Sequence, residues 1–169
     1  MKVINLFGGP GSGKSTTRAG VFNLLKLKAI DVEETTEYAK DITWEKRFNT
    51  LEDSLYVLAK QNHRLHRIEK QVEWCVTDSP LILSSIYNEY IEPSVYYHLV
   101  MELWGKYENY NFFIKRVKDY NPKGRNQTEE EAKAIDGKIK SILNSREIPF
   151  IELEGNKNTA QAIVNQLGL

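Results

Sequence analysis

Short apolar runs alternate with longer stretches of helical periodicity along the 169 residues of this chain. Apolar runs bounded by turn-forming residues are typical of strands that are buried on both faces of a parallel sheet. We expect five strands, at residues 2–7, about 29–33, 74–77, 110–115 and 150–153. Strands that alternate with helical patterns indicate βαβ units, so the pattern predicts a parallel sheet.

The stretches between these strands place apolar residues at the spacings of one helix face. The clearest helical pattern extends over residues 51–72. Another long helix opens at Thr128, where Glu131 completes a capping box. Its buried stripe is expected to comprise Ala132, Ile135, Ile139 and Ile142. Further helices are expected at about residues 15–28, 94–107 and 159–168.

Right-handed helical crossovers between five parallel strands build a three-layer α/β/α sandwich. The chain carries no internal repeat, low-complexity tract or Pro/Gly/Ser-rich linker that would mark a second domain. We therefore expect residues 1–169 to form a single α/β domain. Ligands of such folds bind beyond the carboxyl ends of the strands, so the residues that follow each strand are the candidates for chemistry.

Residues 8–15, directly after the first strand, read GGPGSGKS and fit the phosphate-binding pattern G-x-x-x-x-G-K-[ST]. Glycines let this loop, the P-loop, curl so that its N–H groups point at phosphate oxygens, and the next helix adds its positive dipole end. Lys14 is expected to reach the β- and γ-phosphates, and Ser15 to ligate Mg²⁺. An ordinary Gly-rich turn is the alternative, but strand, loop and helix stand in the required order. The sequence therefore predicts binding of a nucleoside triphosphate.

Acidic residues follow the second and third expected strands. Asp78 ends an apolar strand, where a carboxylate holds Mg²⁺ directly or through water, and Ser79 is a lesser candidate for the same network. The alternative for Asp78 is a turn-starting residue, helped by Pro80. Glu37 would face the phosphates from the acceptor side and take the proton of an attacking hydroxyl. Its alternative is a solvated carboxylate in the first turn of a helix.

Other polar residues could complete an acceptor site. Lys40 and Asp41 are fallback candidates beside Glu37, and Tyr38 could stack on an acceptor base or sugar. Gln61 and Arg64 lie on nearby faces of the helix at 51–72 and form a possible acceptor-binding wall.

Basic residues gather after the fourth expected strand, in a segment at about 116–128. Kinases close a mobile lid whose arginines neutralise charge on the γ-phosphate. Arg116 and Arg125 could bracket the transferring group, while Pro122 and Gly124 let the segment bend. A solvated basic loop is the alternative.

Several segments carry a resemblance to a known family: GGPGSGKSTT, TEYAKD, LAKQNHRL, TDSPL and RVKDYNPKGRNQTEEEA. With them the chain resembles the small P-loop kinases of the nucleoside and nucleotide kinase superfamily, especially compact versions encoded by bacteriophages. The stretch YNPKGRNQTEEEA is the most particular, and it is similar to 5-hydroxymethyluracil DNA kinases, which phosphorylate modified bases in phage DNA. The likeness also extends to nicotinamide riboside kinase-like domains and deoxynucleoside kinases.

The resemblance implies an ATP- and Mg²⁺-dependent transfer of the γ-phosphoryl group to a hydroxyl of a nucleobase or nucleoside. Carried over by position, Glu37 would serve the acceptor, Asp78 would serve Mg²⁺, and Arg116 and Arg125 would belong to the lid. The residues that would bind ATP are Gly8, Gly9, Pro10, Gly11, Ser12, Gly13, Lys14, Ser15 and Thr16.

The charge balance of the chain does not identify the acceptor. The 23 Lys and Arg residues balance 23 Asp and Glu residues, whereas proteins that act on DNA usually carry a basic surface. Only the helix around Arg64 and the segment 116–128 are locally basic, and Tyr38 and Tyr120 are the evident aromatic residues for a flipped base. A free nucleoside or deoxynucleoside monophosphate kinase is therefore the alternative acceptor class.

A third reading is a P-loop ATPase or switch that has no phosphoryl acceptor. Guanine-binding switches normally show Asn-Lys-x-Asp, but residues 156–159 read NKNT, and the chain is short for an oligomeric motor. The single cysteine, Cys75, fits a reducing cytosol, and neither a signal peptide nor a bilayer-spanning apolar stretch is evident. The expected location is therefore the cytoplasm, that of the host if the protein is phage-encoded.

Overall fold

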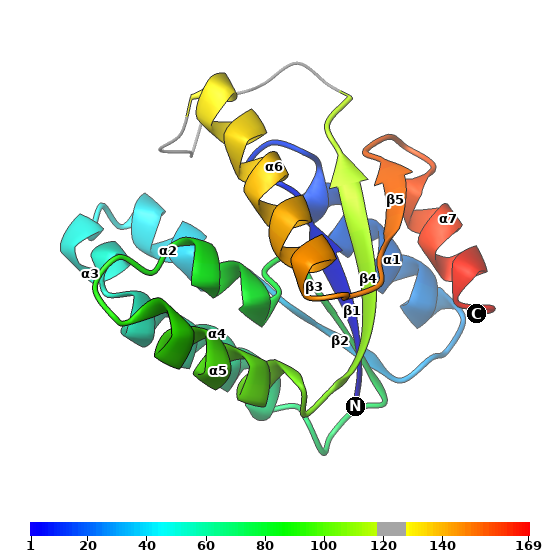
Figure 1. Cartoon of the computed structure of the whole chain (residues 1–169). Coiled ribbons are helices and arrows are strands. Elements are labelled where there is room, and N and C mark those ends of the chain that lie inside the picture. The colour runs from blue at the N-terminus through cyan, green and yellow to red at the C-terminus, as the bar shows by residue number, and fades with distance from the viewer. Residues whose placement is uncertain (118–127) are drawn as a thin grey trace.

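A computed structural model describes residues 1–117 and 128–169 of the chain. At its centre lies a five-stranded sheet with the order β2-β3-β1-β4-β5, in which every pair is parallel (Figure 1). The strands are β1 (Lys2–Phe7), β2 (Val32–Thr35), β3 (Trp74–Thr77), β4 (Glu108–Lys115) and β5 (Ile151–Glu154). The α/β fold with a five-stranded parallel sheet is therefore confirmed.

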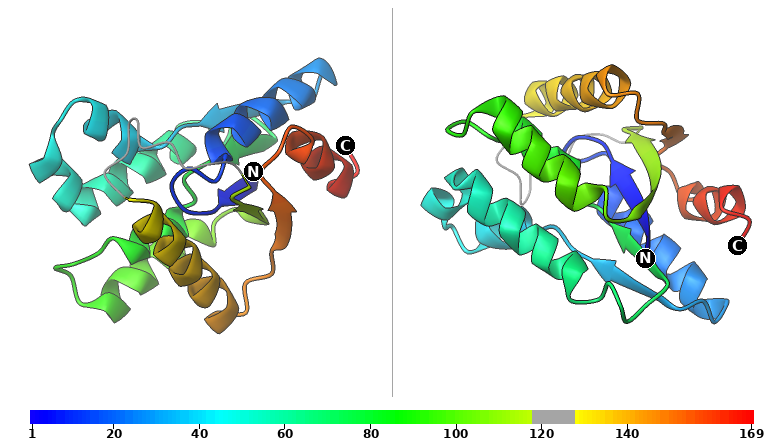
Figure 2. Two further views of the ribbon diagram at one scale, coloured as in Figure 1. Left: turned by 90° about the horizontal axis from the view of Figure 1, so that it is seen from above. Right: turned by 60° about the horizontal axis from the view of Figure 1, so that its bottom comes forward.

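Helices connect the strands and cover both faces of the sheet. They are α1 (Lys14–Leu27), α2 (Tyr38–Trp44), α3 (Phe48–Glu52), α4 (Ser54–His66), the 3₁₀ helix η1 (Leu81–Ile86), α5 (Pro93–Trp104), α6 (Glu129–Ser145) and α7 (Thr159–Gln166). Residues of α1 and α7 pack on one face, and residues of α4, α5 and α6 pack on the other, which makes three layers (Figure 2). No helix in the described part of the chain is long and apolar enough to cross a bilayer.

Side chains of β1 alternate between two hydrophobic clusters, one on each face of the sheet. Val3 and Phe7 pack in the cluster with α4, α5 and α6, while Ile4 and Leu6 pack in the cluster with α1 and α7. All four side chains are at most 1% exposed. Burying an apolar side chain of this size contributes about 1.5–3 kcal/mol, so packing on both faces fixes β1 at the sheet centre. The loop that follows β1 therefore starts from a rigid point.

The strand β2 begins later than the sequence pattern indicated. The pattern favoured a strand at about residues 29–33, but β2 covers Val32–Thr35. Ala29 has a φ of 58° and its N–H donates to Lys26 O at 3.0 Å, so this residue turns the chain after α1. The shift places the carboxyl end of β2 at Thr35, two residues before Glu37.

The long helix expected at residues 51–72 is divided. Asp53 caps a new helix, α4, by accepting a hydrogen bond from the Tyr56 N–H at 3.0 Å, and α4 ends at His66. Leu58 and Leu65 are buried as expected, but Leu55 is 43% exposed. One helix therefore ends at Glu52 and a new one begins at Ser54, so the apolar residues before and after Asp53 do not share one helix face. The apolar periodicity alone does not reveal this break.

The capping box that opens α6 is confirmed. The Thr128 hydroxyl accepts from the Glu131 N–H, and the Glu131 carboxylate accepts from the Thr128 N–H. The buried face of α6 ends with Leu143 rather than with Ile142, which is only partly buried. Residues 118–127 lie outside the described residues, and with them lie Arg125 and most of the expected lid.

Candidate functional site

The expected functional residues meet at the carboxyl edge of the sheet. Here β1 leads into the P-loop, β2 into Glu37, β3 into Asp78 and β4 into Arg116. A cavity of about 420 Å³ opens at this edge. Its lining comprises Gly8, Pro10, Gly11, Gly13, Lys14, Ser15, Thr16, Glu37, Ala39, Lys40, Thr43, Trp44, Leu51, Ser54, Val57, Gln61, Asp78, Ser79, Leu83, Ser84 and Tyr87. P-loop and candidate acceptor residues thus share one cavity.

The P-loop owes its curvature to backbone conformations that favour glycine. Gly13, the residue before α1, has a φ of 100°, which a side chain would strain. The Lys14 ammonium donates to Gly8 O at 2.7 Å and to Gly9 O at 3.1 Å, so it lies across the loop. Burial lowers the pKa of Lys14, while the carboxylates of Glu37 and Asp78 oppose this effect. The loop therefore holds a partly buried cation at the start of a helix, which suits an anionic group.

Helix α6 packs directly against the P-loop through Asp136. The Asp136 carboxylate accepts a hydrogen bond from the Gly9 N–H and pairs with the Arg116 guanidinium at 3.1 Å. Arg116 also donates to Pro10 O at 2.9 Å. A Cβ atom at Gly9 would lie 2.5 Å from Ala132 O, so only glycine permits this close approach. Arg116, expected in the lid, is thus anchored beside the P-loop with only 8% of its side chain exposed.

Asp78 is buried at the end of β3, where its carboxylate forms an ion pair but one oxygen makes no hydrogen bond. The side chain of Asp78 is 3% exposed, and its Oδ1 has no hydrogen-bond partner among the described residues. The Arg18 guanidinium lies 3.5 Å from this oxygen and 2.8 Å from the Glu34 carboxylate. The residues described hold no group of three or more His, Cys, Asp or Glu side chains that could bind a metal ion by themselves. Asp78 and Ser15 therefore fit a Mg²⁺ ion whose other ligands are phosphates and water.

Glu37 lines the cavity from the start of α2. It is the N-cap residue of α2, yet its side chain makes no capping hydrogen bond. Burial raises the pKa of Glu37, whereas the Lys14 ammonium lowers it and the Asp78 carboxylate raises it. A carboxylate with a raised pKa at a cavity wall is suited to accept a proton.

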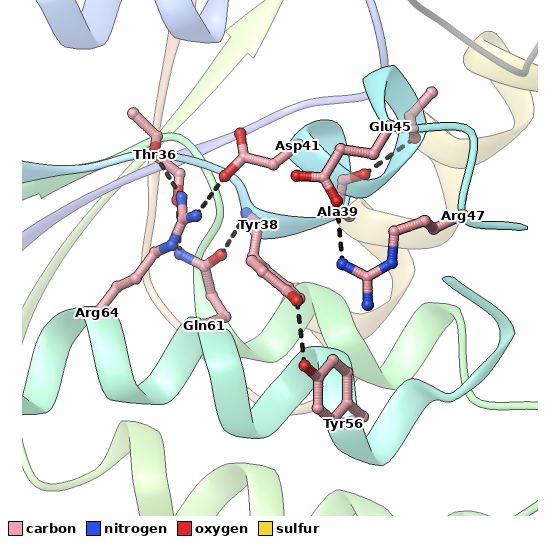
Figure 3. A network of polar contacts seen from close by, with 10 residues as sticks. Thr36, Tyr38, Ala39, Asp41, Glu45, Arg47, Tyr56, Gln61 and Arg64 are labelled. Atoms are coloured by element: carbon pink, nitrogen blue, oxygen red, sulfur yellow. Dashed lines mark hydrogen bonds and ion pairs between the residues drawn. The ribbon is translucent and has the colours of Figure 1, made fainter. Parts of the chain in front are cut away.

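The segment around Glu37 is held by α4, as Figure 3 shows. Gln61 bonds to the backbone of Thr36 and Tyr38, and Arg64 bonds to Thr36 and pairs with Asp41. The Tyr38 ring packs edge-on against Tyr56 at 6.0 Å between ring centroids. Tyr38 is therefore engaged by protein groups, and its stacking on an acceptor stays a prediction.

The part of the cavity away from the phosphates is aromatic and apolar. Trp44 and Tyr87 line it together with Leu51, Val57 and Leu83. Burial, and then the Glu37 carboxylate, raises the pKa of Tyr87 to about 12. Neither Trp44 nor Tyr87 was expected at the site, because Trp44 ends the short helix α2 and Tyr87 directly follows the 3₁₀ helix η1, and the apolar pattern predicted neither element. Trp44 and Tyr87 are thus further aromatic candidates beside Tyr38, while Tyr120 lies outside the described residues.

Two further residues were missed although the sequence carries a signal for each. Arg18 lies one helical turn after Lys14, on the same face of α1. Asp136 lies next to Ile135, one turn after Ala132, and so interrupts the apolar face of α6. A charged residue on a buried face indicates a specific partner. The partners are Asp78 and Glu34 for Arg18, and Arg116 and the Gly9 N–H for Asp136.

Comparisons with known proteins agree with this architecture. A family model described as an AAA domain matches residues 3–160. The fold is shared with the structure of deoxyadenosine kinase from M. mycoides with products dCMP and a flexible dCDP bound, at a TM-score of 0.57 and 16% sequence identity. This similarity covers 98% of both chains. A comparison with curated proteins gives no match.

Proposed function

The chain belongs to this AAA domain family, and we propose that it is an ATP- and Mg²⁺-dependent kinase of the nucleoside and nucleotide kinase kind. One observation carries the proposal. Glu37 and the aromatic wall line the same cavity as Lys14 and Asp78, so a second substrate has room beside the triphosphate. A switch or motor needs a phosphate site but no such acceptor pocket. The fold shared with a deoxyadenosine kinase supports the same class.

In the proposed reaction, the acceptor hydroxyl oxygen bonds to the γ-phosphorus while the bond from that phosphorus to the β,γ-bridging oxygen breaks. Glu37 takes the hydroxyl proton and ADP departs. Lys14 and the P-loop N–H groups hold the β- and γ-phosphates, and Arg116 supplies positive charge at the margin of the loop. Mg²⁺, held by Ser15 and Asp78, would neutralise charge on the phosphate oxygens when bound.

The acceptor that we propose is 5-hydroxymethyluracil in bacteriophage DNA. The likeness of YNPKGRNQTEEEA to kinases of this base supports it, as does a cavity wall built from Trp44 and Tyr87. A volume of about 420 Å³ lies within the range of about 300–1,000 Å³ that is common for small-ligand sites. A base would enter this cavity from single-stranded DNA or after flipping out of a duplex.

Incubation with γ-labelled ATP tests both the reaction and the acceptor. The panel comprises oligonucleotides with 5-hydroxymethyluracil, single- and double-stranded, matched thymine oligonucleotides, and free nucleosides and deoxynucleoside monophosphates. We expect label on DNA that contains 5-hydroxymethyluracil and none on thymine DNA. The Lys14→Ala variant serves as the blank, because it removes the cation that positions the phosphates.

The second candidate is a kinase of free nucleosides or deoxynucleoside monophosphates. The balanced charge of the chain favours it, since DNA-binding proteins usually display a basic surface. Label on free nucleosides alone would establish this candidate and exclude the DNA acceptor. ATP hydrolysis without any labelled acceptor would instead indicate a P-loop ATPase.

A further inference from the structure

We infer that Gln61 is a positioning residue, which caps α2 from a neighbouring helix and so leaves the Glu37 carboxylate free to face the cavity. The inference rests on the proposed function, in which Glu37 accepts the acceptor proton. It differs from the sequence-based reading of Gln61, which made this residue a contact for the acceptor itself.

Gln61 holds the backbone on both sides of Glu37. Its Oε1 accepts the Tyr38 N–H at 2.9 Å, and its Nε2 donates to Thr36 O at 3.1 Å. The residue is 3% exposed, and Figure 3 shows its amide between these two partners. One planar side chain thus fixes the peptide groups before and after Glu37.

The N-terminus of α2 explains why such a clamp is needed. The first N–H groups of a helix have no partner within the helix, and a side chain at the N-cap satisfies at most the second or third of them. Glu37 is the N-cap residue, but its side chain makes no capping bond. The Tyr38 N–H, the first of the helix, is satisfied by Gln61 instead. The first turn of α2 is therefore held in place by Gln61, while the Glu37 side chain makes no capping bond.

Arg64 shares the Thr36 carbonyl with Gln61 but not the Tyr38 N–H. Its guanidinium donates to Thr36 O at 2.9 Å and pairs with Asp41. Arg64 thus contacts Thr36 and Asp41 but not the Tyr38 N–H. Among the described residues, the side chain that accepts this N–H is that of Gln61. Loss of Gln61 should thus free this donor specifically and loosen the backbone that carries the Glu37 carboxylate.

The variant Gln61→Met keeps the length of the side chain and removes both hydrogen bonds. We expect kcat to fall about 10- to 100-fold, because small misplacements of a catalytic group cost about this much, while the acceptor KM changes less than about threefold. In a Glu37→Gln background the same change should lower kcat less than about threefold, since the two residues act through one group. His63→Ala, an exposed change on α4, is the matched control.

Two readouts do not require activity. NMR titration should show that the pKa of the Glu37 carboxyl falls in Gln61→Met, because a loosened backbone lets the carboxylate gain solvent and lose the burial that raises its pKa. Amide exchange of Tyr38 should also become faster in this variant. Gln61→Glu retains an acceptor for the Tyr38 N–H but has no donor for Thr36 O. Its kcat and its Tyr38 exchange rate should therefore lie between those of the wild type and those of Gln61→Met. This variant serves as the test if Gln61→Met folds poorly.

The outcomes separate this inference from the proposed function. A raised acceptor KM with unchanged kcat and unchanged Glu37 titration would make Gln61 an acceptor contact and overturn the positioning role. Full additivity with Glu37→Gln would do the same. If Glu37→Gln itself had the wild-type rate, the role of Glu37 in the proposed function would fail, whatever the titration shows about the cap.

Discussion

Glu37 is subject to opposing influences on its charge. Burial raises its pKa, the Lys14 ammonium lowers it, and the Asp78 carboxylate raises it again. The charged or titratable groups that face Glu37 are those of Lys14, Lys40, Asp41, Asp78 and Tyr87. At the residue scale, the balance favours a carboxyl that is neutral at a higher pH than an ordinary glutamate and that can still ionise to act as a base.

This balance predicts the pH dependence of transfer. Since the base must be ionised, the rate should rise as the pH rises through the raised pKa of Glu37, which lies above about 4.3, the ordinary value. The same raised pKa gives stability at low pH that is lost as the pH rises through it. Glu37→Gln should remove this rise of the rate on the acidic side of the pH profile (the acidic limb) and lower kcat by about 10²–10⁴.

Pre-steady-state transfer rates measured across pH check the prediction. Glu52→Gln, at an exposed position at the end of α3, is the matched control and should keep both the limb and the rate. An unchanged acidic limb in Glu37→Gln would show that another group is the base.

The positions of residues that belong to a local motif could be predicted from the sequence. Their side-chain partners could not. The P-loop pattern and the strand-end position predicted where Lys14, Glu37 and Asp78 would lie. The partner of Arg116 could not be predicted in the same way, because Asp136 comes from α6, which packs on the P-loop only in the folded chain. Side-chain partners far apart in sequence depend on tertiary packing.

At the scale of elements, periodicity predicted the strands and the long helices but not the short pieces between β2 and α4. Helices α2 and α3 have 7 and 5 residues, too short for a distinct apolar period. They nevertheless supply Trp44 and Leu51 to the cavity wall. This part of the cavity is thus built from elements that apolar spacing does not reveal.

The contact between α6 and the P-loop gives a prediction at this scale. Asp136→Ala removes the acceptor of the Gly9 N–H and the partner of a buried guanidinium, so the free energy of unfolding should fall by about 1–3 kcal/mol. Asp136→Asn keeps an oxygen that can accept from the Gly9 N–H, so it should lose less stability than Asp136→Ala. Chemical denaturation measures both, and Lys138→Ala on an exposed position of α6 is the control. Equal free energies of unfolding for all three variants would show that the contacts of Asp136 with Gly9 and Arg116 contribute nothing to stability.

For the whole molecule, five parallel strands bring residues from distant parts of the sequence to one edge. The strand order β2-β3-β1-β4-β5 places the P-loop strand between the strands that lead to Asp78 and Arg116. Alternation of strands and helices predicted the three-layer sandwich, since short parallel connections leave few other arrangements. The lining of the cavity could not be predicted in this way, because its walls come from four separate segments of the chain.

The central claim is that the phosphoryl group held by the P-loop passes to a hydroxyl rather than to water. ³¹P NMR of the protein with ATP, Mg²⁺ and an oligonucleotide that contains 5-hydroxymethyluracil tests it directly, with the free nucleosides as parallel samples. We predict that a phosphomonoester resonance of the acceptor grows in step with ADP while inorganic phosphate stays absent. Inorganic phosphate as the sole product with every acceptor would contradict the account.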